Sequence, residues 1–299
     1  MRIKPECALC ITRQVVDVAK EITDDKSEQF KIIAWGIEKI SEAYGESSVP
    51  SFMGTEIHRH IKKMTNNCDP YKNLKNVANE FALKYLNNVE KLLESDDELE
   101  RLQNKVKLSI AGNVIDFGPY STGVDVEKMV KDTLDGKLDV DFSKELLNEL
   151  RNSKKVFYTC DNAGEIVFDL PLIKELKNYV EVVVSVKGSP ILNDATLEDV
   201  KTAGIDKVTK VITSGTDAIG IRFEESSKEF INELNSSDFV IAKGMGNYES
   251  LTEYEEKHGQ NSEKIPVYYI LKAKCEPVAE HVGVCEGDNV LLRKEISKV

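Results

Sequence analysis

The spacing of apolar residues divides the 299-residue chain into two parts with different periodicity. In the first hundred residues, apolar positions recur at steps of three and four, which is typical of helices that bury one face. Such sets lie within residues 11–22 and 30–40, and another helix is predicted to begin at Asp69 and Pro70, since Asp caps helices and Pro suits their first turn. We therefore predict a helical N-terminal lobe over residues 1–105.

Beyond about residue 154, short runs of apolar and β-branched residues alternate with helical segments. Each run is bounded by turn or helix signals, as expected of buried parallel strands joined by crossover helices. The predicted strands are residues 156–159, 180–186, 208–213, 239–242 and 267–271. We predict a doubly wound, Rossmann-like α/β/α sheet of mostly parallel strands within residues 106–299, forming one functional unit with the helical lobe.

The net charge of the chain excludes some classes of binding partner. Its net charge is -12, and Lys and Arg are interleaved with Asp and Glu, whereas a nucleic-acid groove needs a basic face. No polybasic patch, apolar leader or run of ~20 apolar residues points to a membrane. Six cysteines are too sparse for a disulfide scaffold. We expect a cytoplasmic protein that binds neither nucleic acid nor membranes.

Polar residues follow each predicted strand at the point where the strand ends. Ligands of open α/β sheets bind beyond the carboxyl ends of the strands, so these segments are candidates for a binding site. Residues 160–165 and 187–196 follow the first two strands, and residues 214–217, 243–248 and 272–274 follow the other three. We expect the five segments to meet in one crevice.

A metal site is predicted at the first two strand ends. Asp161, Asn162 and Asp194 would give a cation only oxygen ligands, which suits Mg²⁺ or Mn²⁺. The open coordination positions would accept water and a phosphate oxygen. Gly164 would let backbone amides approach the ligand, and Glu165 is predicted to orient or deprotonate the water. The competing interpretation is that Asp and Asn follow strands only as helix caps and turn residues.

Two lysines are predicted to carry the counter-charge of a phosphate. A strongly acidic protein that binds a phosphomonoester must place cations locally, and Lys243 and Lys274 follow predicted strands, although ordinary surface lysines are the alternative. Asn247 and Tyr248 offer hydrogen bonds to the rest of the substrate.

An upstream segment and a pair of cysteines form two further candidates. The segment at 111–118 places Asn113 and Asp116 between glycines, and we expect it to close one side of the site or to form a plain turn. Cys7 and Cys10 could join Cys68, His58 or His60 in a second metal or redox site. The sequence does not contain a complete zinc-binding motif. The competing interpretation is that these cysteines are buried or have no chemical role.

Over most of its length the chain resembles the damage-control phosphatase family, long catalogued as domain of unknown function 89. The segments that carry the resemblance are AGNVIDFG at 111–118, DNAGE at 161–165, KGSPILNDAT at 187–196, SGTD at 214–217 and DFVIAKGMGNY at 238–248. The resemblance implies that Asp161, Asn162 and Asp194 are metal ligands. It implies substrate contacts at Lys243, Gly244, Asn247 and Tyr248.

The same resemblance implies an activity. The family is expected to hydrolyse phosphate monoesters of sugars or damaged metabolites with Mn²⁺, Co²⁺, Ni²⁺ or Mg²⁺, on a Rossmann-like domain that carries a helical lobe. Residues 271–274 (Leu-Lys-Ala-Lys) stand where the eukaryotic sugar-phosphate branch has Arg-Thr-x-Lys, and only the last Lys is kept. In this difference, and in the presence of Cys7 and Cys10 near its start, the chain resembles the prokaryotic branch of the family.

Other function classes fit the sequence less well. A nucleotide-binding oxidoreductase or transferase would need Gly-x-Gly-x-x-Gly after an early strand, but Gly244 and Gly246 come late and lack the third glycine. An aspartyl-phosphate phosphatase would place a second Asp where Ala163 stands, so attack by water is favoured. A non-catalytic metal or sugar-phosphate binding module is the other alternative. We expect a metal-dependent phosphoric monoester hydrolase.

Overall fold

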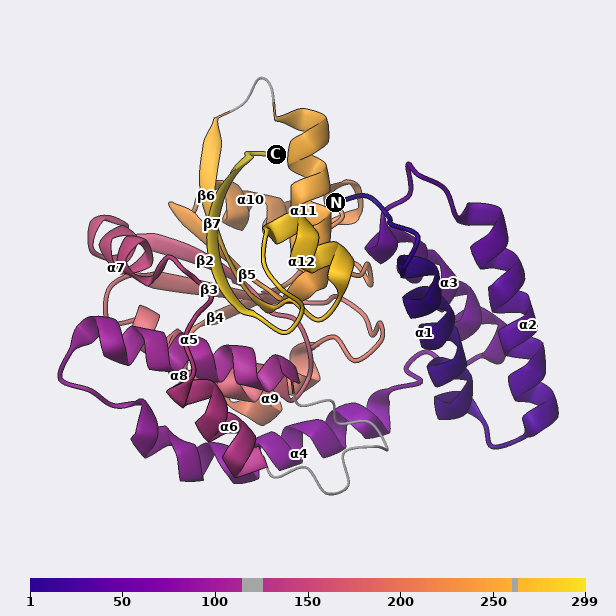
Figure 1. Ribbon diagram of the computed structural model, residues 1–299, viewed down its shortest axis with the longest axis horizontal. Coiled ribbons are helices and arrows are strands. Elements are labelled where there is room, and N and C mark those ends of the chain that lie inside the picture. The colour runs from indigo at the N-terminus through magenta and orange to yellow at the C-terminus, as the bar shows by residue number, and fades with distance from the viewer. Residues whose placement is uncertain (115–125, 260–262) are drawn as a thin grey trace.

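The computed structural model describes residues 1–114, 126–259 and 263–299 (Figure 1). Within these residues seven strands form one sheet in the order β1-β7-β6-β5-β2-β3-β4. The strands are β1 (Val140–Asp141), β2 (Lys155–Thr159), β3 (Glu181–Val186), β4 (Lys210–Thr213), β5 (Phe239–Lys243), β6 (Lys264–Lys272) and β7 (Asn289–Ser297). Of the strand pairs in the described part of the chain, only β6–β7 is antiparallel. The prediction of a mostly parallel α/β sheet is confirmed.

The strand order reverses between β2 and β5. From β2 the chain proceeds to β3 and β4 towards one edge, and it then returns to place β5 on the other side of β2. In doubly wound sheets the ligand crevice opens beyond the carboxyl ends of the strands at this switch point. The residues that follow β2 and β5, Asp161 and Gly244 among them, therefore occupy the favoured position for a site.

Two strands lie outside the prediction. β1 contains two residues, too few to produce a periodic pattern. β7 pairs along its length with β6, but Arg293, Lys294 and Glu295 interrupt its apolar run. The sequence therefore lacked the continuous apolar signal that marks a strand buried on both faces.

Helices cover both faces of the sheet (Figure 1). One face packs against α4 (Lys72–Val89), α5 (Glu98–Val114), α7 (Ser143–Asn152), α8 (Glu165–Leu176) and α9 (Leu197–Ala203), and α6 (Val126–Asp135) lies beside α5. The other face packs against α10 (Lys228–Asn235), α11 (Gly244–His258) and α12 (Glu276–Val282). Successive residues of β2 enter opposite cores, Tyr158 the first and Phe157 the second, because side chains alternate along a strand.

The first three helices form a bundle with its own hydrophobic core. They are α1 (Cys7–Ile22), α2 (Lys26–Ala43) and α3 (Pro50–Thr65), and Val15, Ile32 and Ile61 lie at the centre of their packing. By contrast, α4 and α5 pack on α8 of the sheet domain. The predicted boundary at residue 105 lies inside α5, and the core of the bundle extends to Leu74 in the first turn of α4. A periodic apolar stripe shows that a helix buries one face but not which partner covers it.

The helices α3 and α4 begin in different ways. Pro50 is the first residue of α3, where its missing N–H costs no helical hydrogen bond. The carboxylate of Asp69, expected to cap a helix, instead pairs with Lys75 at 2.8 Å, and α4 begins at Lys72. No helix in the described part of the chain is long and apolar enough to cross a bilayer.

The contact between α1 and α2 depends on Gly36. A Cβ atom at this position would lie 2.4 Å from Cγ1 of Val15, so we expect Gly36→Ala to lower the free energy of unfolding by about 1–3 kcal/mol through overpacking. Fluorescence of Trp35, the single tryptophan, follows unfolding of the bundle in urea. Gly45→Ala is the control, because its Cβ meets no described atom within 4 Å. Equal stability of the two variants would contradict the close packing.

His58 makes the stability of the bundle depend on pH. Its side chain is 2% exposed, and burial together with the charge of Lys62 lowers its pKa to about 4. In the unfolded chain the pKa of this histidine is near 6.5. Between pH ~4 and ~6.5 the unfolded chain therefore binds the proton more readily than the folded protein does. The contribution of neutral His58 to the free energy of unfolding is therefore complete above pH ~6.5. This free energy declines by roughly 2–3 kcal/mol as the pH falls to ~4.5.

We expect His58→Leu to remove this part of the pH dependence. Urea unfolding monitored by Trp35 between pH 4.5 and 7.5 measures it, with His258→Leu, at an exposed histidine, as the control. A slope in the His58 variant equal to that of the wild type would show that another group is responsible.

Candidate functional site

The backbone brings the segments after β2 and β3 together. The N–H of Ala163 donates to the carbonyl of Asn193 at 2.8 Å, and the N–H of Ala195 donates to the carbonyl of Asp161, also at 2.8 Å. These bonds flank an isolated antiparallel bridge between Asn162 and Asp194. Three residues from two distant parts of the sequence therefore stand at one point beyond the sheet.

Acidic groups are concentrated at this point. Burial raises the pKa of the Asp161 carboxyl well above its usual range, and the nearby carboxylates of Glu165 and Asp194 raise it further, while Lys274 opposes them. Burial likewise raises the pKa of Asp194, against the effect of Lys187. Carboxyl groups held together in this way resist ionisation unless a cation is present.

The donor set fits a hard divalent cation. Asp161 and Asp194 supply carboxylate oxygens and Asn162 an amide oxygen, and the amide nitrogen of Asn162 donates to Oδ2 of Asp161 at 3.0 Å. Oxygen ligands of this kind suit Mg²⁺ or Mn²⁺. Among the described residues no group of three His, Cys, Asp or Glu side chains is placed to hold a metal, so the amide is needed to complete the predicted triad.

The segment predicted to close the site lies largely outside the described residues. Asn113 belongs to α5, but its side chain is outside the described residues, as is the whole of Asp116. Their predicted contact with the substrate stays a prediction.

Gly244 allows the end of β5 to approach Asp161. It has φ +77, and a Cβ atom there would lie 2.0 Å from Oδ2 of Asp161. Only glycine satisfies both conditions, because any other side chain would be strained by the backbone and would overlap the carboxylate. The carboxylate of Asp161 thus packs on the first residue of α11.

Lys243 lies beneath the site in a buried cluster of charges. Its ammonium is 2.5 Å from Oε1 of Glu165, 2.6 Å from Oδ1 of Asp169 and 3.3 Å from the carbonyl of Ser109, and the side chain is fully buried. Burial by itself would lower the pKa of Lys243, but the two carboxylates outweigh it and raise the pKa. A direct contact between Lys243 and phosphate, as predicted, would require the ammonium to leave these partners.

Asn247 and Tyr248 are likewise bound to protein groups. The amide nitrogen of Asn247 donates to the carbonyls of Cys160 at 3.1 Å and Lys243 at 2.8 Å, which joins the end of β2 to α11. The hydroxyl of the buried Tyr248 lies 2.7 Å from Nδ1 of His281 on α12. These contacts stabilise the wall of the site, and the predicted contacts with substrate stay predictions.

Lys274 differs from Lys243 in its surroundings. Its side chain is exposed, and it makes no hydrogen bond or ion pair with the residues that the structure describes. Its charge nevertheless lowers the pKa of Asp161, so it lies within electrostatic reach of the acidic cluster. Of the two lysines predicted to face a phosphate, Lys274 has the more suitable position.

Sequence reasoning missed two residues that support the site. Lys187 places its ammonium 3.5 Å from Oδ2 of Asp194 and donates to the carbonyl of Gly220. Asn79 of α4 accepts the N–H of Gly164 at 2.7 Å, which ties α4 to the residue before α8. Lys187 directly follows β3, so its position marked it as a candidate site residue. Asn79 lies within α4, where no sequence motif indicates a binding site.

The predicted thiol site is not assembled. Cys7 is buried in the first turn of α1, whereas Cys10 and Cys68 are exposed, and the described residues contain no metal-binding group that includes them. Of the other thiols, Cys160 is buried in the core and Cys285 is exposed.

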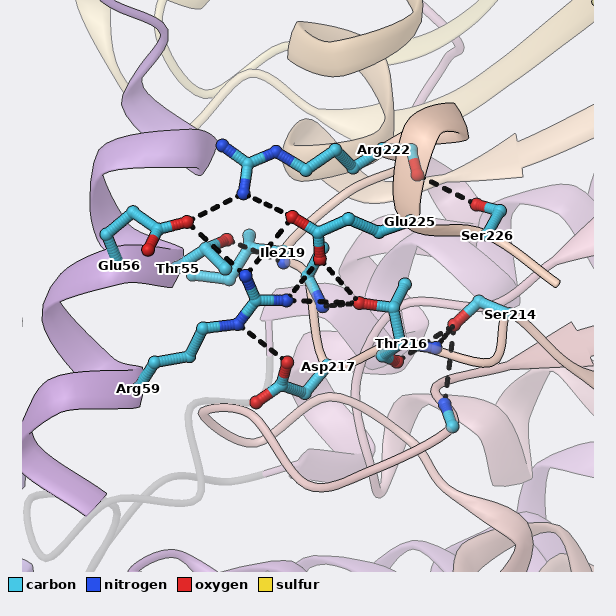
Figure 2. Close-up of polar contacts among 12 residues, drawn as sticks. Thr55, Glu56, Arg59, Ser214, Thr216, Asp217, Ile219, Arg222, Glu225 and Ser226 are labelled. Atoms are coloured by element: carbon cyan, nitrogen blue, oxygen red, sulfur yellow. Dashed lines mark hydrogen bonds and ion pairs between the residues drawn. The ribbon is translucent and has the colours of Figure 1, made fainter. Parts of the chain in front are cut away.

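A network of ion pairs joins α3 to the segment after β4 (Figure 2). Nε of Arg59 donates to Oδ1 of Asp217 at 2.7 Å, and its terminal nitrogens contact Thr216 and Glu225. Asp217, in the polar segment predicted after this strand, is thus an ion-pair partner of Arg59. The sequence identified the polar segment but not the helix that it meets.

Comparisons with known proteins agree with this architecture. The family profile described as "Damage-control phosphatase ARMT1-like domain" matches residues 3–290. An uncharacterised protein of Methanocaldococcus jannaschii is 60% identical over 297 residues, covering 98% of this chain and 96% of the relative. A damage-control phosphatase of Pyrococcus horikoshii is 34% identical over 297 residues, covering 99% of each chain.

The similarity extends to a solved structure. The crystal structure of a DUF89 family protein from Pyrococcus horikoshii matches this structure with a TM-score of 0.86 and 33% sequence identity, and the match covers 100% of both chains. It therefore includes the helical bundle as well as the sheet. The chain belongs to the damage-control phosphatase family defined by the ARMT1-like domain.

Proposed function

We propose that the protein is a metal-dependent phosphatase that hydrolyses phosphate monoesters of small metabolites, such as sugar phosphates or damaged phosphometabolites. The observation that carries this proposal is the convergence of Asp161, Asn162 and Asp194 at the switch point of the sheet. Membership of a phosphatase family supports the reaction class. The oxygen-only donor set supports the requirement for a metal.

Asp161, Asn162 and Asp194 would hold the cation, which would be Mn²⁺, Co²⁺, Ni²⁺ or Mg²⁺. A bound divalent ion neutralises a phosphoryl oxygen and lowers the pKa of a water molecule to make it a nucleophile. The protein's own contribution is to hold the three ligands together through the backbone bonds between the two strand ends.

Glu165 is the proposed group that orients the attacking water and accepts its proton. It is the first residue of α8, three positions after Asn162, and Lys243 holds its Oε1 at 2.5 Å. This charge-assisted bond fixes the carboxylate, and a fixed base loses little freedom when it engages the water. In this arrangement Lys243 acts through Glu165.

The negative charge of the substrate would be compensated by two features. Lys274 is exposed and electrostatically close to Asp161. In addition, α8 begins at Glu165 and α11 at Gly244, so the positive ends of both helix dipoles lie at the site. Together they favour an anionic ligand on a protein whose net charge is strongly negative.

Removal of one ligand tests the proposed reaction. We expect metal-free protein to regain hydrolysis of p-nitrophenyl phosphate with Mn²⁺ or Mg²⁺, and Asp161→Asn to lower kcat/KM by roughly 10²–10³-fold, since metal stabilisation of the transition state is worth several kcal/mol. Circular dichroism checks that the variant is folded. Activity of Asp161→Asn equal to that of the wild type would place the metal elsewhere.

The contact between Gly244 and Asp161 gives a second test. We expect Gly244→Ala to lose Mn²⁺ affinity and activity, because the new Cβ would displace the carboxylate. Gly204→Ala is a matched control: its φ is +76, and its Cβ would meet no described atom within 4 Å. Both variants carry a backbone strain of about 1 kcal/mol, but only the first should change Mn²⁺ binding, measured by calorimetry. Equal Mn²⁺ affinities would refute the steric argument.

A further inference from the structure

Helix α3 of the bundle makes polar contacts with the segments that follow β3 and β4. The ammonium of Lys62 donates to the carbonyl of Pro190 at 2.7 Å and pairs with Oδ2 of Asp217 at 2.6 Å. Arg59, three residues earlier, binds the other oxygen of Asp217 (Figure 2). Residues three apart share one face of a helix, so one face of α3 contacts both the segment after β3 and the segment after β4.

Pro190 belongs to the same short loop as Asp194. The N–H of Asp194 donates to the carbonyl of Ile191 at 3.1 Å, which closes a turn between the two. Pro190 and Asp194 are only four residues apart, and the turn between Ile191 and Asp194 restricts the backbone that joins them. A movement of Pro190 would therefore displace Asp194.

Leu192, inside this loop, has a backbone conformation that needs external support. Its φ is +46, and a bulky side chain in this left-handed region costs about 1–2 kcal/mol. Such a conformation persists only where its surroundings enforce it. The side chain of Leu192 packs against the hydrophobic core of the α1–α3 bundle, so the bundle supplies that support.

The segments after β3 and β4 are also braced against each other. The N–H of Gly188 donates to the carbonyl of Thr216 at 2.9 Å, and a Cβ at Gly188 would lie 2.6 Å from the backbone of Gly215. Lys62 contacts both braced segments, one at Pro190 and the other at Asp217. Its loss would release the loop from α3 at a point close to the proposed metal ligand.

We propose that Lys62 is a positioning residue that fixes Asp194 for metal binding, so that the helical bundle sets the geometry of the metal site. The inference rests on the proposed function, since it concerns a ligand of the proposed metal. Lys62 does not contact the metal, and its effect passes through the carbonyl of Pro190 and the turn that ends at Asp194.

The test compares two adjacent lysines. Lys62→Met removes both polar contacts, whereas Lys63→Met removes an exposed ammonium that has no partner among the described residues. Calorimetric titration of metal-free protein with Mn²⁺ should show a Kd raised about 10–100-fold for Lys62→Met, as is typical when support for a metal ligand is lost, and an unchanged Kd for Lys63→Met. Lys62→Arg should recover part of the affinity, because a guanidinium can still reach a carbonyl and a carboxylate.

The outcomes separate this inference from the proposed function. If wild-type protein binds Mn²⁺ and hydrolyses p-nitrophenyl phosphate but Lys62→Met binds Mn²⁺ equally well, the positioning role is overturned and the phosphatase stands. A lower urea midpoint in Lys62→Met without a change in Mn²⁺ affinity would also overturn it, since the residue would then be only structural. Wild-type protein that neither binds Mn²⁺ nor turns over substrate would overturn the proposed function and the positioning role with it.

Discussion

The antiparallel bridge between Asn162 and Asp194 is the contact on which the site depends. Parallel strands place their carboxyl ends at one edge of a sheet, but they do not determine how the following loops meet. Here the bonds between Ala163 and Asn193 and between Ala195 and Asp161 join two loops into a short ladder. The ladder orients the side chains through backbone geometry, which is the least adjustable part of the chain and therefore well suited to holding a metal.

Buried charge is the second constraint. Burying Glu165 and Asp169 without a cation would cost several kcal/mol each, and Lys243 compensates both of them. Burial raises the pKa of Asp161, Asp169 and Asp194, and at Asp194 the charge of Lys187 opposes the shift. A divalent cation bound beside Asp161 and Asp194 would favour their ionised forms, which is consistent with the proposed metal.

The helical bundle is connected to this chemistry by α3. Its cations contact the segments after β3 and β4, and its core receives Leu192 from the loop that carries Asp194. A bundle attached in this way would influence the metal site. Variation of α3 among relatives would then alter metal affinity without any change in the ligands themselves.

The sequence by itself determined the parallel strands β2 to β6 and the polar segments at their ends, but not β1 or β7, because strands buried on both faces produce continuous apolar runs that are readable locally. It also indicated Asp161, Asn162 and Asp194, since residues that directly follow strands have a predictable location. Only the tertiary structure decided that Lys243 turns inward to Glu165, that Tyr248 binds His281, and that α4 joins the sheet domain while α3 holds the loop of Asp194. Side-chain partners of this kind are separated by tens to hundreds of residues, and no local pattern records which surfaces meet when the layers pack.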